Sequence, residues 1–106
     1  MNYIVHLAGL IRIELGPDSL PDEPVDELLR YYAVLALAVG SSIRAEDVHN
    51  AWVSWMIARD PDHPALVPYG QLDPETAIQD EPFVRAIRSV VAKNPSLMKQ
   101  AGVHGD

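Results

Sequence analysis

Cysteine is absent from this 106-residue chain, and lysine occurs only twice, as Lys93 and Lys99. Without cysteine there can be no disulfide, no thiolate nucleophile and no zinc site built on cysteine ligands. The eight basic residues stand singly along the chain, against 15 acidic residues and a formal net charge of −7. Proteins that bind nucleic acid need a basic face to contact the phosphates. The sequence therefore predicts no nucleic-acid partner.

Long hydrophobic runs and glycine-rich loops are also missing. A membrane-spanning helix needs about 20 apolar residues, and the apolar stretch at residues 1–11 is followed at once by Arg12 and Glu14. That stretch lacks the positive residues that begin a signal peptide, so we predict a helix of the folded domain. We predict no membrane partner. The six glycines are scattered, which excludes a phosphate-cradling loop.

What the chain does contain is apolar residues at helical spacing, with no strand-like alternation. Hydrophobic residues make up 48% of the chain, enough for a core without metal or disulfide support. The spacing predicts an all-α fold, a compact bundle of about four main helices plus a short helix, with a Pro-rich connector at residues 60–70. We expect a single helical domain over residues 1–95 and a weakly ordered C-terminal tail over residues 96–106. The predicted helices span about 2–15, 22 or 24 to 39, 45–59, 73–79 and 80–93, with Asp22 as the predicted cap of the second.

The second predicted helix is apolar on every side over residues 31–39. Such a helix lies either at the centre of a core or against another chain. A chain of about 100 residues has few helices with which to surround it, and the first helix also has a wide apolar face. This combination predicts a homodimer. The expected interface residues are Tyr3, Leu10, Tyr31, Val34 and Leu37.

Patterns that could support catalysis or metal binding are incomplete. Asp60-Pro61-Asp62-His63, with His49 on the preceding helix, offers carboxylate and imidazole ligands. The spacing fits no known metal site and is typical of a rigid turn capped by its own acids. No Gly-X-Ser-X-Gly nucleophile motif occurs. We predict no metal, no cofactor and no enzymatic activity. Only convergence of His49, His63 and Asp62 in a cleft would favour a hydrolase.

Paired acids mark two of the predicted helix starts. Glu46 and Asp47 begin one helix, and Asp80 and Glu81 begin another. Acids in a first turn stabilise the helix dipole. That role explains both pairs without a catalytic function.

An aromatic and basic cluster is the strongest candidate for a binding site. Trp52 and Trp55 could build a cleft that stacks a planar ligand, while Arg59 pairs with an anionic group. At helical spacing the same two tryptophans also fit a simple core role, and the sequence leaves both interpretations open. The candidate ligand-binding residues are His49, Trp52, Trp55, Arg59, His63 and Tyr69.

Three segments together resemble the ryanodine-receptor-type (RyR) repeat domain. They are Val48-His-Asn-Ala-Trp52, His63-Pro-Ala-Leu-Val-Pro-Tyr-Gly-Gln-Leu72, and Asp80 before a helix. They match the family's His-X-X-Trp helix, its Pro-X-Leu-Val-Pro-Tyr-X-X-Leu turn and its acidic residue before the last helix. The resemblance covers residues 45–93. Residues 59–62 stand where the family carries a Gly-Trp-X-Tyr-Gly segment.

The whole chain also resembles small proteins of actinobacterial phages and their hosts. These share its Asp-Val-His-X-Ala-Trp and Pro-Phe-Val-X-Ala-Ile signatures, and the preference for Arg over Lys suggests a GC-rich genome. The expected function is therefore a non-enzymatic phage or prophage accessory protein in the bacterial host cytoplasm, acting by protein–protein interaction as a homodimer. The RyR resemblance implies an alternative, a regulatory module that binds a small, nucleotide-derived ligand.

Overall fold

Helix boundaries in this protein follow local capping signals. The computed structural model describes residues 2–20 and 24–100. The side chain of Asn2 accepts a hydrogen bond from the Val5 amide at 2.9 Å and caps the first helix. Gly16 and Gly40 end the first two long helices with positive φ angles of 78° and 57°. Other residues adopt such angles only with strain, so glycine is favoured at both stops.

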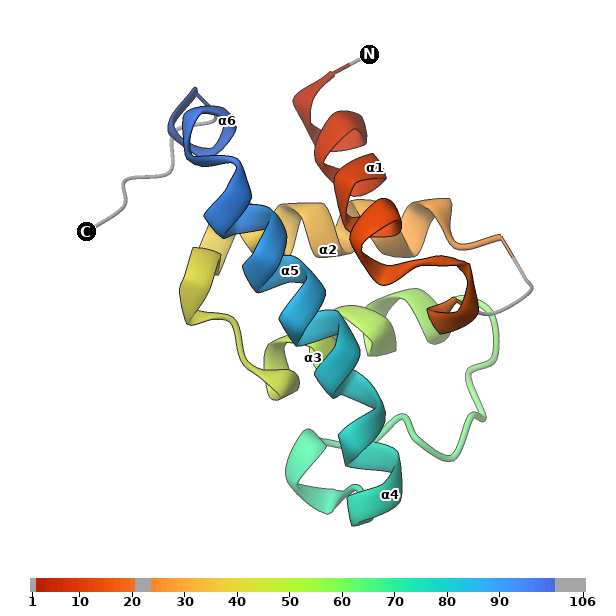
Figure 1. The fold of residues 1–106 in the computed structure, drawn as a ribbon. Helices are drawn as coiled ribbons and strands as arrows, with labels where there is room; N and C mark the ends of the chain where they lie inside the picture. The colour runs from red at the N-terminus through yellow and green to blue at the C-terminus, as the bar shows by residue number, and fades with distance from the viewer. Residues whose placement is uncertain (1, 21–23, 101–106) are drawn as a thin grey trace.

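The described residues form helices and no strands, which confirms the all-α prediction. Helices α1, α2, α3 and α5 are long, and α4 and α6 are short (Figure 1). The elements in chain order are α1 (Tyr3–Leu15), η1 (Pro17–Ser19), α2 (Asp26–Val39), η2 (Gly40–Ser42), α3 (Ala45–Met56), η3 (Tyr69–Gln71), α4 (Pro74–Ala77), η4 (Ile78–Asp80), α5 (Glu81–Lys93) and α6 (Pro95–Gln100), where η denotes a 3₁₀ turn.

Two boundaries differ from the sequence prediction. Helix α3 ends at Met56 rather than Arg59, because the amides of Arg59 and Asp60 both turn back to the Met56 carbonyl, at 2.9 and 2.8 Å. Pro61 disfavours a helical conformation at the residue before it, so the chain leaves the helix early. The start of α2 is Asp26; the predicted cap at residue 22 lies outside the described residues.

The tail also differs from its prediction over residues 96–100. These residues continue from Pro95 as α6, and the Met98 amide donates to the Asn94 carbonyl at 3.1 Å. Proline suits the first position of a helix, and Met98 is buried against the core. Packing of this one side chain favours order where composition alone predicts little. Residues 101–106 of the predicted tail lie outside the described residues.

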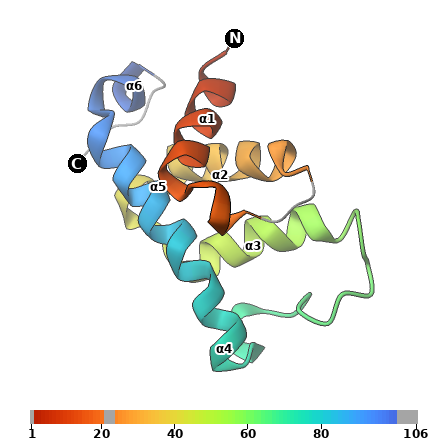
Figure 2. The same cartoon turned by 45° about the vertical axis from the view of Figure 1, so that its right-hand side comes forward.

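The core lies between α1, α2 and α5. Helix α5 runs from α4 at one end of the molecule to α6 at the other, and α2 passes behind it (Figures 1 and 2). The apolar face of α1 contributes Leu7 and Ile11, both fully buried. They meet Leu29 of α2 and Ile87 of α5 in one continuous hydrophobic cluster. No helix of the described residues combines the length and the apolar character needed to cross a membrane.

The apolar helix α2 is covered largely within one chain. The buried face includes Leu28, Tyr32 and Ala36, against α1, α3 and α5. Of the expected interface residues, Tyr3 and Val34 are each 53% exposed. The other three, Leu10, Tyr31 and Leu37, are half-buried against the core. The homodimer stays a prediction, with a smaller free apolar surface than the sequence suggested.

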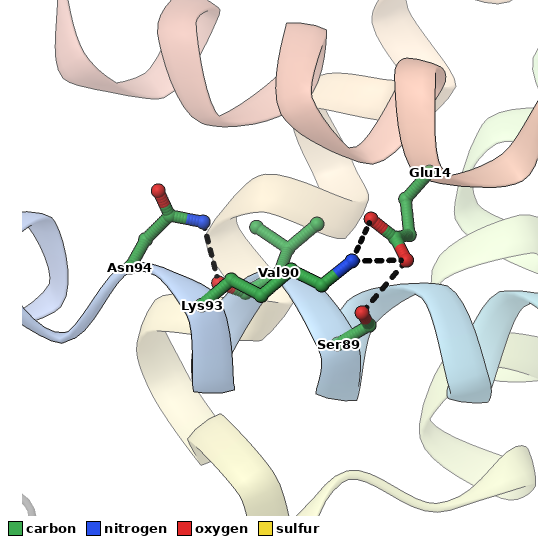
Figure 3. Close-up of polar contacts among 5 residues, drawn as sticks. All are labelled: Glu14, Ser89, Val90, Lys93 and Asn94. Carbon is green, nitrogen blue, oxygen red and sulfur yellow. Dashed lines mark hydrogen bonds and ion pairs between the residues drawn. The ribbon is translucent and has the colours of Figure 1, made fainter.

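A polar bridge fastens α1 to α5 at the surface. The Glu14 carboxylate accepts a hydrogen bond from the Ser89 hydroxyl at 2.7 Å and pairs with the Lys93 ammonium at 3.1 Å (Figure 3). These hydrogen bonds lower the pKa of Glu14. One turn further along α5, the Asn94 side chain donates to the Val90 carbonyl at 2.8 Å and caps the helix end. Ser89 and Lys93 lie 75 and 79 positions after Glu14 in the sequence, so the bridge is a long-range contact.

Candidate ligand-binding site

A cavity of about 290 Å³ opens between α2, α3, the connector and the start of α5. This volume lies at the lower end of the range for small-molecule sites, which are mostly apolar with a few convergent polar groups. The walls fit that description. The lining residues are Leu28, Tyr32, His49, Trp52, Trp55, Met56, His63, Ala65, Leu72, Thr76, Gln79, Asp80 and Phe83.

Helix α3 supplies one wall because its sequence repeats ring side chains at helical spacing. His49 and Trp52 are three residues apart and therefore neighbours on one face. Their rings stack with centroids 5.7 Å apart and an interplanar angle of 23°. Helix α2 and α5 supply Tyr32 and Phe83, whose ring centroids lie 5.5 Å apart. Aromatic surface thus reaches the cavity from three helices.

His49 is the polar centre of the site, and only 3% of it is exposed. Its Nε2 lies 2.7 Å from the Val67 carbonyl oxygen. A carbonyl only accepts, so Nε2 must carry the proton and donate it. The other ring nitrogen, Nδ1, then faces Asp80, with 3.9 Å between Nδ1 and Oδ2. Position and proton of this ring are fixed by the connector on one side and by η4 on the other.

Asp80 is a half-buried acid, with 15% of its side chain exposed. Burial raises the pKa of Asp80 to about 6, against the lowering effect of nearby His49. Loss of water around a carboxylate disfavours its charged form. The same burial, with the charge of Asp80, raises the pKa of Tyr32. Asp80 makes no side-chain capping bond to α5, so its position at the helix start does not use up its oxygens.

The connector closes the site with His63. Its Nδ1 accepts a hydrogen bond from the Ala65 amide at 3.0 Å. A backbone N–H only donates, so the ring is neutral in this conformation and carries its proton on Nε2. The edge of the ring meets Trp52, with centroids 5.0 Å apart at 81°. Trp52 is therefore held between the two histidines.

Arg59 lies behind the cavity rather than inside it. Its guanidinium covers the Trp55 ring at 4.1 Å and donates to the Trp55 carbonyl at 3.0 Å. It also pairs with Glu27 of α2 at 3.3 Å. The contacts of Arg59 are thus with its own chain. Trp55 is 1% exposed, and its buried Nε1–H has no hydrogen-bond partner among the described residues.

Four of the six predicted ligand-binding residues line the cavity: His49, Trp52, Trp55 and His63. Of the other two, Arg59 packs behind Trp55 as described, and Tyr69 sits against His49 with ring centroids 6.1 Å apart. The two interpretations of the tryptophans both describe part of the structure. Trp55 is a core residue, while Trp52 is half-buried between the histidines.

Sequence reasoning missed Asp80, Tyr32 and Phe83 as members of the site. The position of Asp80 at a helix start was explained by the helix dipole, and Tyr32 and Phe83 lie at helical positions that are equally typical of a core. The one signal that could have found Asp80 was its match to the acidic residue of the RyR pattern. Nothing in helical spacing separates a ring that faces a cavity from one that faces the core.

The hydrolase arrangement does not form around Asp62. Asp62 is exposed and does not line the cavity, whereas His49 and His63 do, separated by Trp52. Among residues 2–20 and 24–100, no three His, Cys, Asp or Glu side chains gather in a way that could hold a metal ion. The geometry instead isolates one acid, Asp80, beside one histidine.

Residues 2–92 match a family model described as a domain of unknown function, DUF7701. The chain belongs to the DUF7701 family. The match runs from the cap of α1 nearly to the end of α5, so α1 and α2 are part of the same domain as the cavity-bearing half. No curated protein and no solved structure shows significant similarity to the chain.

Proposed function

We propose that this DUF7701 domain is a non-enzymatic regulatory module that binds a small ligand in the cavity between α3 and the start of α5. One observation carries the proposal: aromatic walls converge on His49, His63 and Asp80, and backbone hydrogen bonds of the connector fix both histidines. Apolar walls with a few oriented polar groups are what small-molecule sites require. Trp52 separates the two histidines, and in the described part of the chain each hydrogen-bonds to the backbone rather than to a hydroxyl, which favours binding over catalysis.

The RyR resemblance supports the same proposal. Its matched segments are separate in sequence, yet they meet around the His49 ring. The residues that surround this ring are Trp52, Val67, Tyr69 and Asp80. A motif whose separate parts meet at one cavity is more consistent with a binding role than with scattered packing roles. A nucleotide-derived ligand would have to keep its phosphates outside, because no Lys or Arg is among the lining residues.

Native mass spectrometry of the protein, purified gently from a bacterial lysate, tests this proposal. We expect a chain mass plus a small adduct. Trp52→Ala removes the ring between the histidines and should abolish the adduct. Ile57→Ala is the control, because Ile57 follows the same helix, is exposed and does not line the cavity. An adduct that survives Trp52→Ala, or its absence from the wild-type protein together with no effect of added small molecules on tryptophan fluorescence, would contradict the proposal.

Self-association is the second candidate, with a role as a phage or prophage accessory protein. It is supported by exposed apolar side chains on α1 and α2, where Ile13 is 77% exposed and Tyr3 and Val34 are each 53% exposed. Single exposed apolar side chains are common on protein surfaces, whereas a contiguous patch of them marks an interaction site. The same spectra count chains, and Val34→Glu should convert a dimer to a monomer without removing an adduct. A wild-type monomer at micromolar concentration would exclude the dimer.

A further inference from the structure

The cavity contains an acid that no cationic side chain neutralises. Asp80 is the only carboxylate among the lining residues, and within the described part of the chain no Lys or Arg lines the cavity. Its one polar neighbour of opposite potential charge is His49, whose Nδ1 lies 3.9 Å away, beyond hydrogen-bond length. Because Nε2 of His49 already carries a proton for Val67, the ring is neutral unless it takes up a second one.

The walls around this acid are aromatic. Tyr32, Trp52 and Phe83 bring rings to the cavity from three different helices, and Trp55 lies among them. The face of an aromatic ring attracts a cation, most strongly where water is excluded. Arg59 already uses one face of Trp55 in this way at 4.1 Å, from outside the cavity. Inside the cavity, no Lys or Arg of residues 2–20 and 24–100 supplies the cation.

We propose that the cavity binds a small organic cation, a substituted ammonium group whose charge sits at Asp80 and whose apolar body lies against Trp52, Tyr32 and Phe83. This inference rests on the proposed ligand-binding function and names the class of ligand. The ammonium group would pair with the Asp80 carboxylate. Its positive charge would also be attracted by the aromatic rings of the cavity. An anion would face a desolvated carboxylate of like sign, in a chain whose formal net charge is −7.

The affinity for the cation should fall as the pH is lowered. None of the titratable groups around Asp80 opposes this trend. The groups that face it are His49 from α3 and Tyr32 from α2, with Glu81 beside it on α5. A bound cation favours the ionised carboxylate, so it competes with the proton that burial favours. A second proton on His49 would place a positive charge next to the bound one. Tyr32 stays neutral, because burial raises its pKa.

Intrinsic fluorescence gives a direct test, because both tryptophans of the chain line the cavity. The probe is benzyltrimethylammonium, compared at constant ionic strength with benzyl alcohol and benzoate. We expect the cation to bind at least about tenfold more tightly than either. Asp80→Asn should weaken it by at least about tenfold, and Asp62→Asn, an equal change of charge at an exposed acid, should leave it unchanged.

A second variant keeps the test decisive if Asp80→Asn alters the fold, which circular dichroism would report. Phe83→Leu keeps the acid and removes one ring, and should weaken the cation several-fold without affecting benzoate. Benzyl alcohol or benzoate could instead bind as tightly as the cation and lose this binding in Trp52→Ala. That result would overturn the proposed preference for a cation but leave the proposed site standing. Failure of all three probes at roughly 50 mM would overturn both.

Discussion

The two ends of this small bundle solve the problem of covering an apolar helix in different ways. At one end α1 and α5 lie directly on α2, and side chains such as Leu7 and Ile11 are fully buried. At the other end α3 and α5 diverge, and an irregular connector rich in proline closes the gap (Figure 2). The interior of the first end is filled by these buried side chains, whereas the second end opens into a cavity of about 290 Å³.

The difference follows from what each covering element does with its backbone. A helix satisfies its own amides and carbonyls and can place a continuous apolar face on its neighbour. The connector has to find a partner for each of these groups: the Val67 carbonyl accepts a hydrogen bond from His49, and the Ala65 amide donates one to His63. Two of these partners are histidines, one on α3 and one within the connector itself. The polar groups that hold the connector in place are the same ones that make the cavity chemically distinctive.

The largest expected effect is on stability and comes from truncating a side chain in the filled end. Ile11→Ala should reduce the free energy of unfolding by about 2–5 kcal/mol, because the surrounding helices cannot collapse into the space. Ile78→Ala, the same truncation at a side chain 65% exposed on η4, should change it by less than about 0.5 kcal/mol. Urea denaturation measures both. Probe binding per folded molecule should be unchanged in Ile11→Ala, and its loss would mean that the two ends are coupled.

Asp80→Asn should raise the free energy of unfolding, by less than Ile11→Ala lowers it. The folded pKa of about 6 lies above that of an unfolded aspartate, so the folded state holds its proton more tightly, and stability falls as pH rises from about 4 to 6. Above pH 6 the ionised carboxylate costs about 2–3 kcal/mol, an order-of-magnitude figure. We expect Asn to remove this penalty. The measurement is the difference between variant and wild-type unfolding free energies, at several pH values from 4 to 8.

That difference isolates Asp80 from the exposed acids Glu14, Glu27 and Asp73, whose pKa values are lowered by hydrogen bonds and whose contributions have the opposite sign. We expect the difference to be near zero at pH 4 and to grow towards pH 6. A difference that stays flat across this range would mean that Asp80 is solvated like a surface acid.

These two variants also mark how far the sequence could predict the structure. The filled end was predictable, because the spacing of Leu7 and Ile11 and the stops at Gly16 and Gly40 are local signals. At the end that holds the cavity, four of the lining residues were predicted as ligand-binding residues, but Asp80 was not. A helix-start acid has the same local sequence whether its carboxylate caps the helix or faces a cavity. Only the path of the connector decides between them.

The smallest effect is expected at the surface bridge. Lys93→Gln removes the ammonium from Glu14, while the Ser89 hydroxyl keeps its hydrogen bond to the carboxylate. Exposed ion pairs contribute little and are screened by salt. We therefore expect a melting temperature close to that of the wild-type protein, and a difference that vanishes as salt is raised in a thermal melt. A large, salt-independent loss would indicate that the bridge holds α1 in place.

The contact between α1 and α5 also determines when this protein can fold during its own synthesis. Residue 14 meets its partners at residues 89 and 93, so the side of α1 that packs on α5 has no partner until α5 has been synthesised. At about 5–20 residues per second, a gap of 75 residues corresponds to a delay of about 4–15 seconds. During that interval only α2 is available to cover the apolar side of α1, so this helical hairpin shields part of the nascent chain's apolar surface.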